Sequence, residues 1–170
     1  MKDTLHKLAE ESRHKVYTFV YYCLRSHEEA EDITQEVLMK LWQYGGDIEP
    51  ERLPGWIMRV ARNAVIDSTR KQRTRAGVPC GSGGDVGATP APLSLDGDGE
   101  QAVRSRELRE ALETALASLA EPYRSIIVMR EIQEMSYSEI SESLACPLNT
   151  VKVYLHRGRR MLRTSLKGKV

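Results

Sequence analysis

The stretch SYSEISESLACPLNTVKVYLHRGRRMLR, residues 136–163, decides which fold we expect for this chain. Ser136 and Glu139 have the spacing of a capping box, which predicts the start of a short helix. A tight break follows at residues 145–146, and Pro147 sets the start of a longer final helix. A short capped helix, a tight turn and a longer helix together predict a helix-turn-helix.

The final helix of this motif has one apolar face and is otherwise cationic. Residues 143–170 contain seven basic residues and no acid. A cationic helix after a tight turn is typical of the helix that enters the major groove of DNA. An ordinary helical hairpin with a solvated basic face is the alternative. The side chains predicted to point away from the apolar face are Asn149, Lys152, Val153, His156, Arg157, Arg160 and Arg163.

Charge is separated along the 170 residues, although the formal net charge is only +1. Residues 1–75 sum to +1, residues 76–103 to −4 and residues 104–170 to +4. The acidic middle segment holds seven of the twelve glycines and three of the seven prolines, without a sustained hydrophobic period. This composition predicts a flexible linker that joins two small helical domains of an all-α protein.

The segment 1–75 is predicted to form three helices. Apolar spacing predicts the first over about residues 4–25. Ser26 and Glu29 predict a second capping box that starts the next helix, and the third begins near Pro54. The outward face of the second helix carries Glu28, Asp32, Gln35, Glu36 and Met39. The outward face of the third helix carries Arg59, Arg62, Asn63, Asp67 and Arg70.

Several classes of protein are disfavoured. The three cysteines lack CxxC spacing, which argues against a disulfide framework and against a metal site, and no cofactor is expected. The uninterrupted apolar runs, such as residues 126–129, are far shorter than the roughly 20 residues that a membrane span needs. The polar N-terminal stretch lacks a signal-peptide core, so we expect a cytoplasmic protein without membrane insertion. No metalloprotease, nucleophile-elbow or P-loop motif is present, which disfavours an enzyme.

Three stretches, in this order around the linker, resemble the extracytoplasmic function (ECF) sigma factors, small members of the sigma-70 family. They are AEDITQEVLMKLW (30–42), GWIMRVARNAVIDSTRKQRTR (55–75) and the helix-turn-helix stretch 136–163. The resemblance covers both predicted domains. It implies a bacterial transcription initiation factor that binds RNA polymerase core, recognises promoter DNA at two elements and opens the downstream one.

The resemblance implies a role for each outward face in the first domain. The second helix would dock on the coiled coil of the polymerase's largest subunit, through Asp32, Gln35, Glu36 and Met39; a solvated helix face is the alternative. The third helix, with a pocket formed by the loop 45–53, would read and melt the downstream element. Its residues would be Trp56, Arg59, Arg62, Asn63, Asp67 and Arg70. Trp56 could stack on a base, but a core tryptophan that anchors the helix is the favoured interpretation.

In the final helix, the resemblance implies contacts to the upstream element by Asn149, Thr150, Lys152, Val153, Tyr154, His156, Arg157 and Arg160. The sequence departs from the family pattern here, because Val153 and Tyr154 stand where Ser and Arg are common. Ala145 likewise replaces a frequent turn glycine. Losing an arginine removes a possible bidentate contact to guanine, so the promoter sequence cannot be carried over from the family.

Two further expectations remain. The resemblance implies an anti-sigma factor that holds the protein inactive, although no residue identifies it. A helix-turn-helix regulator that binds duplex DNA without polymerase is the alternative function. That alternative explains residues 104–170 but leaves the acidic second helix and the basic third helix without a role.

Overall fold

The computed structural model describes residues 2–77 and 99–168, and every regular element in these two ranges is helical. The all-α fold class is therefore confirmed. The elements are α1 (Lys2–Leu24), α2 (His27–Tyr44), η1 (Gly45–Asp47), η2 (Pro50–Arg52), α3 (Leu53–Arg75), α4 (Glu100–Ser118), α5 (Tyr123–Ile127), η3 (Val128–Ile132), α6 (Tyr137–Leu144) and α7 (Leu148–Lys167). Most of the predicted linker, residues 78–98, lies outside the described residues, and its last four residues belong to α4.

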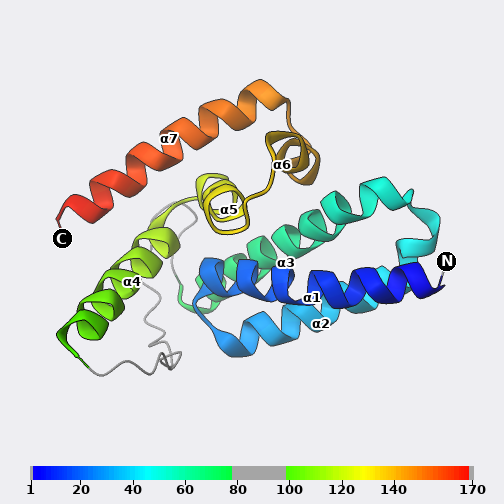
Figure 1. The fold of residues 1–170 in the computed structure, drawn as a ribbon, viewed down its shortest axis with the longest axis horizontal. Helices are drawn as coiled ribbons and strands as arrows, with labels where there is room; N and C mark the ends of the chain where they lie inside the picture. The colour runs from blue at the N-terminus through cyan, green and yellow to red at the C-terminus, as the bar shows by residue number, and fades with distance from the viewer. Residues whose placement is uncertain (1, 78–98, 169–170) are drawn as a thin grey trace.

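The first domain is a bundle of α1, α2 and α3, in which successive helices run in opposite directions (Figure 1). Its core is formed by the apolar spacing seen in the sequence, because Phe19, Val37, Leu41 and Ile57 are all fully buried. The apolar faces of the three helices therefore point inward, as the periodicity predicts.

The start of α2 uses half of the predicted capping box. Ser26 Oγ accepts a hydrogen bond from the Glu29 amide at 3.2 Å. The Glu29 carboxylate instead accepts hydrogen bonds from Ser68 Oγ at 2.6 Å and from Gln72 Nε2 at 2.8 Å, both on α3. Donors on α3 thus replace the Ser26 amide as partners of the Glu29 carboxylate. Glu29 therefore connects the first turn of α2 to the second half of α3.

The second domain consists of α4 to α7, with α5 continuing directly into the π-helical turn η3. α7 packs against α5 at Gly158. A Cβ atom on Gly158 would lie 2.9 Å from Ile127 Cγ1, so glycine permits this close approach of the two helices.

The predicted helix-turn-helix is formed by α6 and α7. Ser136 Oγ accepts from the Glu139 amide at 3.2 Å, and the Glu139 carboxylate accepts from the Ser136 amide at 2.7 Å, which completes the capping box. This backbone hydrogen bond is the main reason why the pKa of Glu139 is lower than its usual value. Ala145 then adopts a left-handed conformation with φ of 50°. The tight break expected at residues 145–146 is therefore present.

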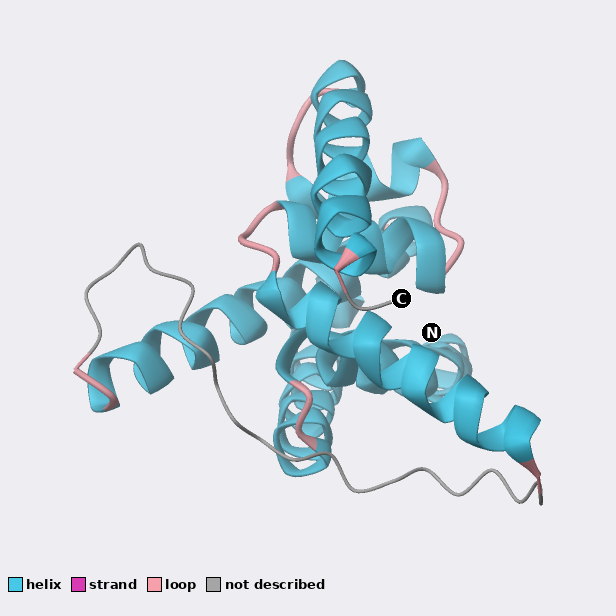
Figure 2. Cartoon of the chain, turned by 90° about the vertical axis from the view of Figure 1, so that its left-hand side faces the viewer, coloured by secondary structure: helices cyan, strands magenta, loops and turns pink. Residues whose placement is uncertain are grey.

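The two domains lie against each other, which the sequence did not indicate. α1 packs against α4, α5 and η3, while α3 packs against α6 (Figures 1 and 2). Arg25 Nη1 donates to Thr114 Oγ1 at 2.9 Å, and Tyr21 OH donates to Glu113 Oε2 at 3.2 Å. Burial and the nearby Glu113 carboxylate raise the pKa of Tyr21, so the phenol remains a donor. None of the described helices combines the length and apolar character needed to cross a membrane.

Candidate nucleic-acid interface

α7 presents a continuous polar and cationic surface. Its buried residues Val151, Leu155 and Gly158 face the rest of the second domain. Because these residues are three and four positions apart, the remaining faces of the helix point to solvent. The exposed residues include Asn149, Lys152, Val153, His156, Arg157 and Arg160.

Two predicted α7 contact residues are less accessible. Thr150 and Tyr154 are half-buried, and the ring of Tyr154 packs edge-on against Tyr123 of α5 at 5.6 Å between centroids. Arg159, which was not among the predicted contacts, pairs with Glu131 of η3 at 2.7 Å. Tyr154 therefore contributes to the α5–α7 packing as well as to the edge of the cationic surface.

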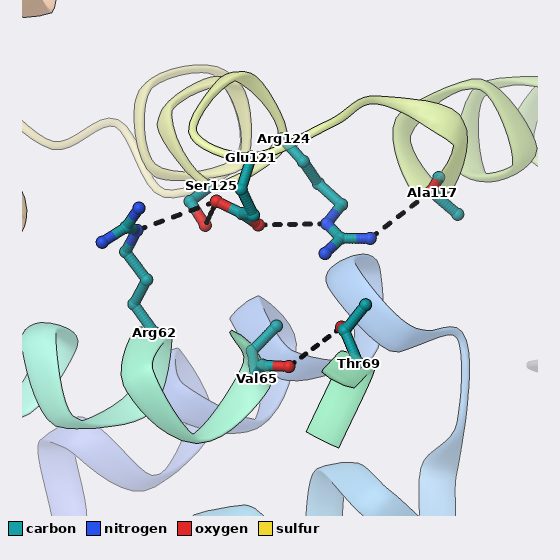
Figure 3. A network of polar contacts seen from close by, with 7 residues as sticks. All are labelled: Arg62, Val65, Thr69, Ala117, Glu121, Arg124 and Ser125. Atoms are coloured by element: carbon teal, nitrogen blue, oxygen red, sulfur yellow. Dashed lines mark hydrogen bonds and ion pairs between the residues drawn. The ribbon is translucent and has the colours of Figure 1, made fainter. Parts of the chain in front are cut away.

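The basic face of α3 is in contact with acids of the second domain. Arg59 Nη2 donates to the main-chain oxygen of Glu142 at 2.5 Å. Arg62 Nε lies 3.7 Å from Glu121 Oε2, which permits charge attraction but is too long for a hydrogen bond. Figure 3 shows this Glu121 carboxylate between Arg62 and the second-domain residues Arg124 and Ser125, which donate to it at 3.2 and 2.6 Å.

The other polar residues predicted on α3 point to solvent. Asn63, Asp67 and Arg70 are exposed, and their spacing of four and three places them along one side of the helix. α3 thus divides its polar residues between a covered pair of arginines and an open stripe.

A shallow pocket of about 420 Å³ lies where the loop after α2 meets the start of α3. It is lined by Asp47, Ile48, Glu49, Arg52, Trp56, Arg59 and Glu142. Trp56 is half-buried and packs against the core, as the favoured interpretation expects, while its exposed part forms pocket wall. The predicted loop pocket is thus present, with one wall supplied by the second domain.

The outward face of α2 is acidic at its beginning and apolar at its end. Asp32, Gln35, Glu36 and Met39 are all exposed, with Met39 70% exposed. Trp42 continues the same stripe three residues further on and is 49% exposed. The sequence analysis missed Trp42, although its spacing from Met39 was a sufficient signal.

Metal and thiol chemistry gain no support. Within residues 2–77 and 99–168, no group of three His, Cys, Asp or Glu side chains could hold a metal ion. Burial raises the pKa of Cys23 and of Cys146, which favours their thiol forms. Cys80 lies outside the described residues.

Comparison with known proteins follows the division into two domains. Residues 8–75 match the family described as Sigma-70 region 2, and residues 109–162 match Sigma-70, region 4. The chain is 32% identical to ECF RNA polymerase sigma factor SigW of Bacillus subtilis, over 98% of this chain and 90% of SigW. It is also 32% identical to ECF RNA polymerase sigma factor SigL of Mycobacterium tuberculosis, over 82% of this chain and 75% of SigL.

Solved structures of similar proteins share the fold. The sigma factor RpoE, in complex with the anti-sigma factor NepR from Bartonella quintana, gives a TM-score of 0.70 at 24% identity, over 98% of both chains. CnrH, in complex with the cytosolic domain of CnrY, gives 0.69 at 16% identity, over 100% of this chain and 92% of CnrH. With both sigma-70 regions matched and a 32% identical relative over nearly its full length, the chain belongs to the ECF RNA polymerase sigma factors of the sigma-70 family.

Proposed function

We propose that this ECF sigma factor binds RNA polymerase core through α2 and directs initiation by placing α3 and α7 on two promoter elements. The observation that carries the proposal is the pairing of an exposed acidic and apolar stripe on α2 with an exposed cationic helix in a helix-turn-helix. A duplex-binding regulator would need only the second of these surfaces. As a member of this family, the chain is a transcription initiation factor and not an enzyme.

The α2 stripe has the composition of a protein interface. Asp32 and Glu36 supply charges that can pair with a basic partner, and they also steer its approach. Met39 and Trp42 supply the apolar area whose removal from water stabilises a complex. The partner that fits this combination is the coiled coil of the polymerase's largest subunit.

The decisive experiment measures the affinity of labelled core polymerase for charge-reversed variants. Asp32→Lys and Glu36→Lys each place like charges against the proposed basic partner, and we expect a loss of about tenfold or more. Glu11→Lys, an exposed acid on α1, makes the same charge change away from the stripe and serves as the control. Normal core affinity in both α2 variants, with helicity unchanged, would contradict the assignment.

α3 and the adjoining pocket are proposed to act on the downstream element after it opens. A strand is held open when an extruded base enters a pocket and cations hold its backbone. The pocket beside Trp56 and the donors Arg59, Arg62 and Asn63 supply these two requirements. Asp67 and Arg70 extend the polar stripe along α3.

α7 is proposed to read the upstream element as duplex DNA. Asn149 and Lys152 lie in its first turns, where helix-turn-helix proteins reach base edges, while Arg157 and Arg160 lie further along for phosphates. Val153 is exposed between them and would add an apolar contact to a thymine methyl group. Thr150, Tyr154 and His156 complete the proposed surface.

The domain boundaries and regulation remain part of the proposal. We assign residues 1–75 and 104–170 to the two acting domains and 76–103 to the linker, so limited proteolysis should first cut within 76–99 and leave two helical fragments. Since the similar sigma factor RpoE is in complex with the anti-sigma factor NepR, we also propose an anti-sigma partner for this chain. We propose that the chain acts in the cytoplasm.

A further inference from the structure

We propose that Glu142 and Glu121 of the second domain act as an internal ligand of the downstream-element site. In the free chain they cover the arginines of α3, and these arginines become available to DNA only when the two domains separate. The inference rests on the proposed role of α3.

Glu142 offers two kinds of acceptor to the first domain. It lies in the last turn of α6, where its main-chain oxygen accepts a 3.3 Å hydrogen bond from the Ala145 amide and belongs to the negative end of the helix dipole. Arg59 donates to this oxygen at 2.5 Å, while Arg52 Nε lies 3.4 Å from the Glu142 carboxylate. One residue thus offers a carbonyl oxygen to Arg59 and a carboxylate to Arg52, two groups of the kind that otherwise contact phosphates of a nucleic-acid backbone.

The surface of α3 is shaped to receive Glu142. Gly55 is buried, and a Cβ atom there would lie 3.1 Å from Cγ, Cδ and Oε2 of Glu142. A side chain at position 55 would push α6 away, so this glycine allows the contact. Because Glu142 also forms part of the wall of the pocket beside Trp56, a DNA strand that enters the pocket must meet it.

A second contact covers the next arginine on the same side of α3. The side chains of Arg62 and Glu121 are only 19% and 20% exposed. Figure 3 shows Arg62 pointing from α3 toward Glu121. Arg59 and Arg62, which are three residues apart on α3, are therefore both in contact with the second domain.

Some buried polar atoms at the contact between the domains lack hydrogen-bond partners, as expected for a contact that must open. Within the described residues, the buried side-chain atoms that lack a hydrogen-bond partner are Arg25 Nε, Arg59 Nε, Arg62 Nε and Gln133 Oε1. All four belong to residues that contact the opposite domain, because Arg25 bonds Thr114 and Gln133 bonds the Lys15 oxygen. Buried groups without partners destabilise the closed arrangement, and a permanent interface normally satisfies them.

A disulfide that locks the domains together tests the proposal in the complete initiation complex. The test variant combines Gly55→Cys with Glu142→Cys. The sulfur at position 142 takes the place of Glu142 Cγ, which lies 3.1 Å from a Cβ atom at position 55, and this separation permits a disulfide. Cys80→Ser and Cys146→Ser remove competing thiols, and Cys23 is buried. Oxidised and reduced samples of this one variant are compared with core polymerase on a pre-opened template.

We expect the oxidised variant to initiate at least about tenfold less than its reduced form. Equal initiation by the two forms overturns the internal-ligand proposal but leaves the proposed function intact. The proposed function fails separately if Arg59→Ala, in the unmodified chain, opens and transcribes promoters normally.

A second pair of variants needs no new cysteine. Glu121→Gln with Glu142→Gln removes the two interdomain carboxylate charges, and Glu107→Gln with Glu110→Gln removes two exposed charges on α4 of the same domain. Binding of the full-length chain to a fluorescein-labelled 12-nucleotide oligothymidylate is measured by anisotropy. We expect the first variant to bind at least about threefold tighter than the second. Equal affinities overturn the proposal.

Discussion

The two basic helices of this sigma factor differ in how accessible their cations are. On α7, Lys152, Arg157 and Arg160 are exposed to solvent. On α3, Arg59 and Arg62 are half-buried and contact Glu142 and Glu121. The two helices look alike in the sequence, yet one is open to DNA and the other is covered by the protein itself.

The difference arises from where the partners of each helix lie along the chain. α7 is positioned by residues of its own domain, such as Ile127 opposite Gly158. Arg59 finds its acceptor 83 positions away in the sequence. Contacts within its own domain therefore keep the cations of α7 exposed. Contacts between the domains make the exposure of the α3 arginines depend on how the domains are arranged.

We expect the largest effect from a substitution that disrupts the packing of α7 against α5. Gly158→Leu forces a side chain into Ile127, and overpacking of this kind costs roughly 1–3 kcal/mol or more. We expect loss of duplex binding together with a lower melting temperature of the second domain, while core binding through α2 is retained. Calorimetry and a duplex-binding assay measure the two effects.

Gly168→Ala is the matched control, because a Cβ atom there meets nothing within 4 Å. If Gly158→Leu leaves duplex affinity and melting temperature at the control's values, α7 is not held by its packing on α5.

A second prediction contrasts the two helices on their DNA targets. Lys152→Ala should weaken duplex promoter binding and reduce its salt slope by about one contact, with less effect on a pre-opened template. Asn63→Ala should leave closed-complex formation intact but reduce opening, as detected by permanganate reactivity of unpaired thymines. Each lost contact should cost of order 1–3 kcal/mol.

If both variants reduce closed-complex formation equally, then α7 and α3 do not have separate roles in duplex binding and strand opening. The plain duplex-binding regulator would then be the better account. Asn63→Ala should leave the first domain folded, because the Asn63 side chain is exposed, and circular dichroism checks this.

A third prediction concerns the turn that orients α7. Ala145 adopts a φ of 50°, where any residue with a Cβ atom is strained. Ala145→Gly should stabilise the second domain by about 1 kcal/mol and raise its melting temperature by a few degrees. An unchanged or lower melting temperature would mean that the greater freedom of glycine in the unfolded chain offsets the relief of strain.

The smallest effect is a pH dependence at the start of α6. The capping box lowers the pKa of Glu139, so its stabilising contribution is present above the unfolded value of about 4.5 and is lost as the pH falls through the lower folded value. Glu139→Gln should lower stability at pH 7 by a few tenths of a kcal/mol and remove that part of the acid dependence. Urea unfolding of the variant and of Glu110→Gln, at neutral and acidic pH, separates this cap from general charge effects.

Much of the fold and the open surfaces could be predicted from the sequence. Helical periodicity placed Phe19, Val37 and Ile57 inside, and the capping box at Ser136 set the start of α6, because both depend on neighbours in the sequence. The covering of Arg59 could not be predicted, since it depends on how two domains meet. The partners of Glu29 were also missed, because its carboxylate accepts hydrogen bonds from Ser68 and Gln72 of α3, which lie 39 and 43 positions away in the sequence.

The hydrogen bonds of Glu29 to Ser68 and Gln72 have a mechanical consequence. They join the beginning of α2 to the far half of α3, while the two helices also share the bundle core. α2 and α3 therefore form a stiff pair, and a force applied to one is carried to the other without an intervening hinge. If polymerase binds α2 as proposed, it also sets the angle at which α3 approaches the DNA.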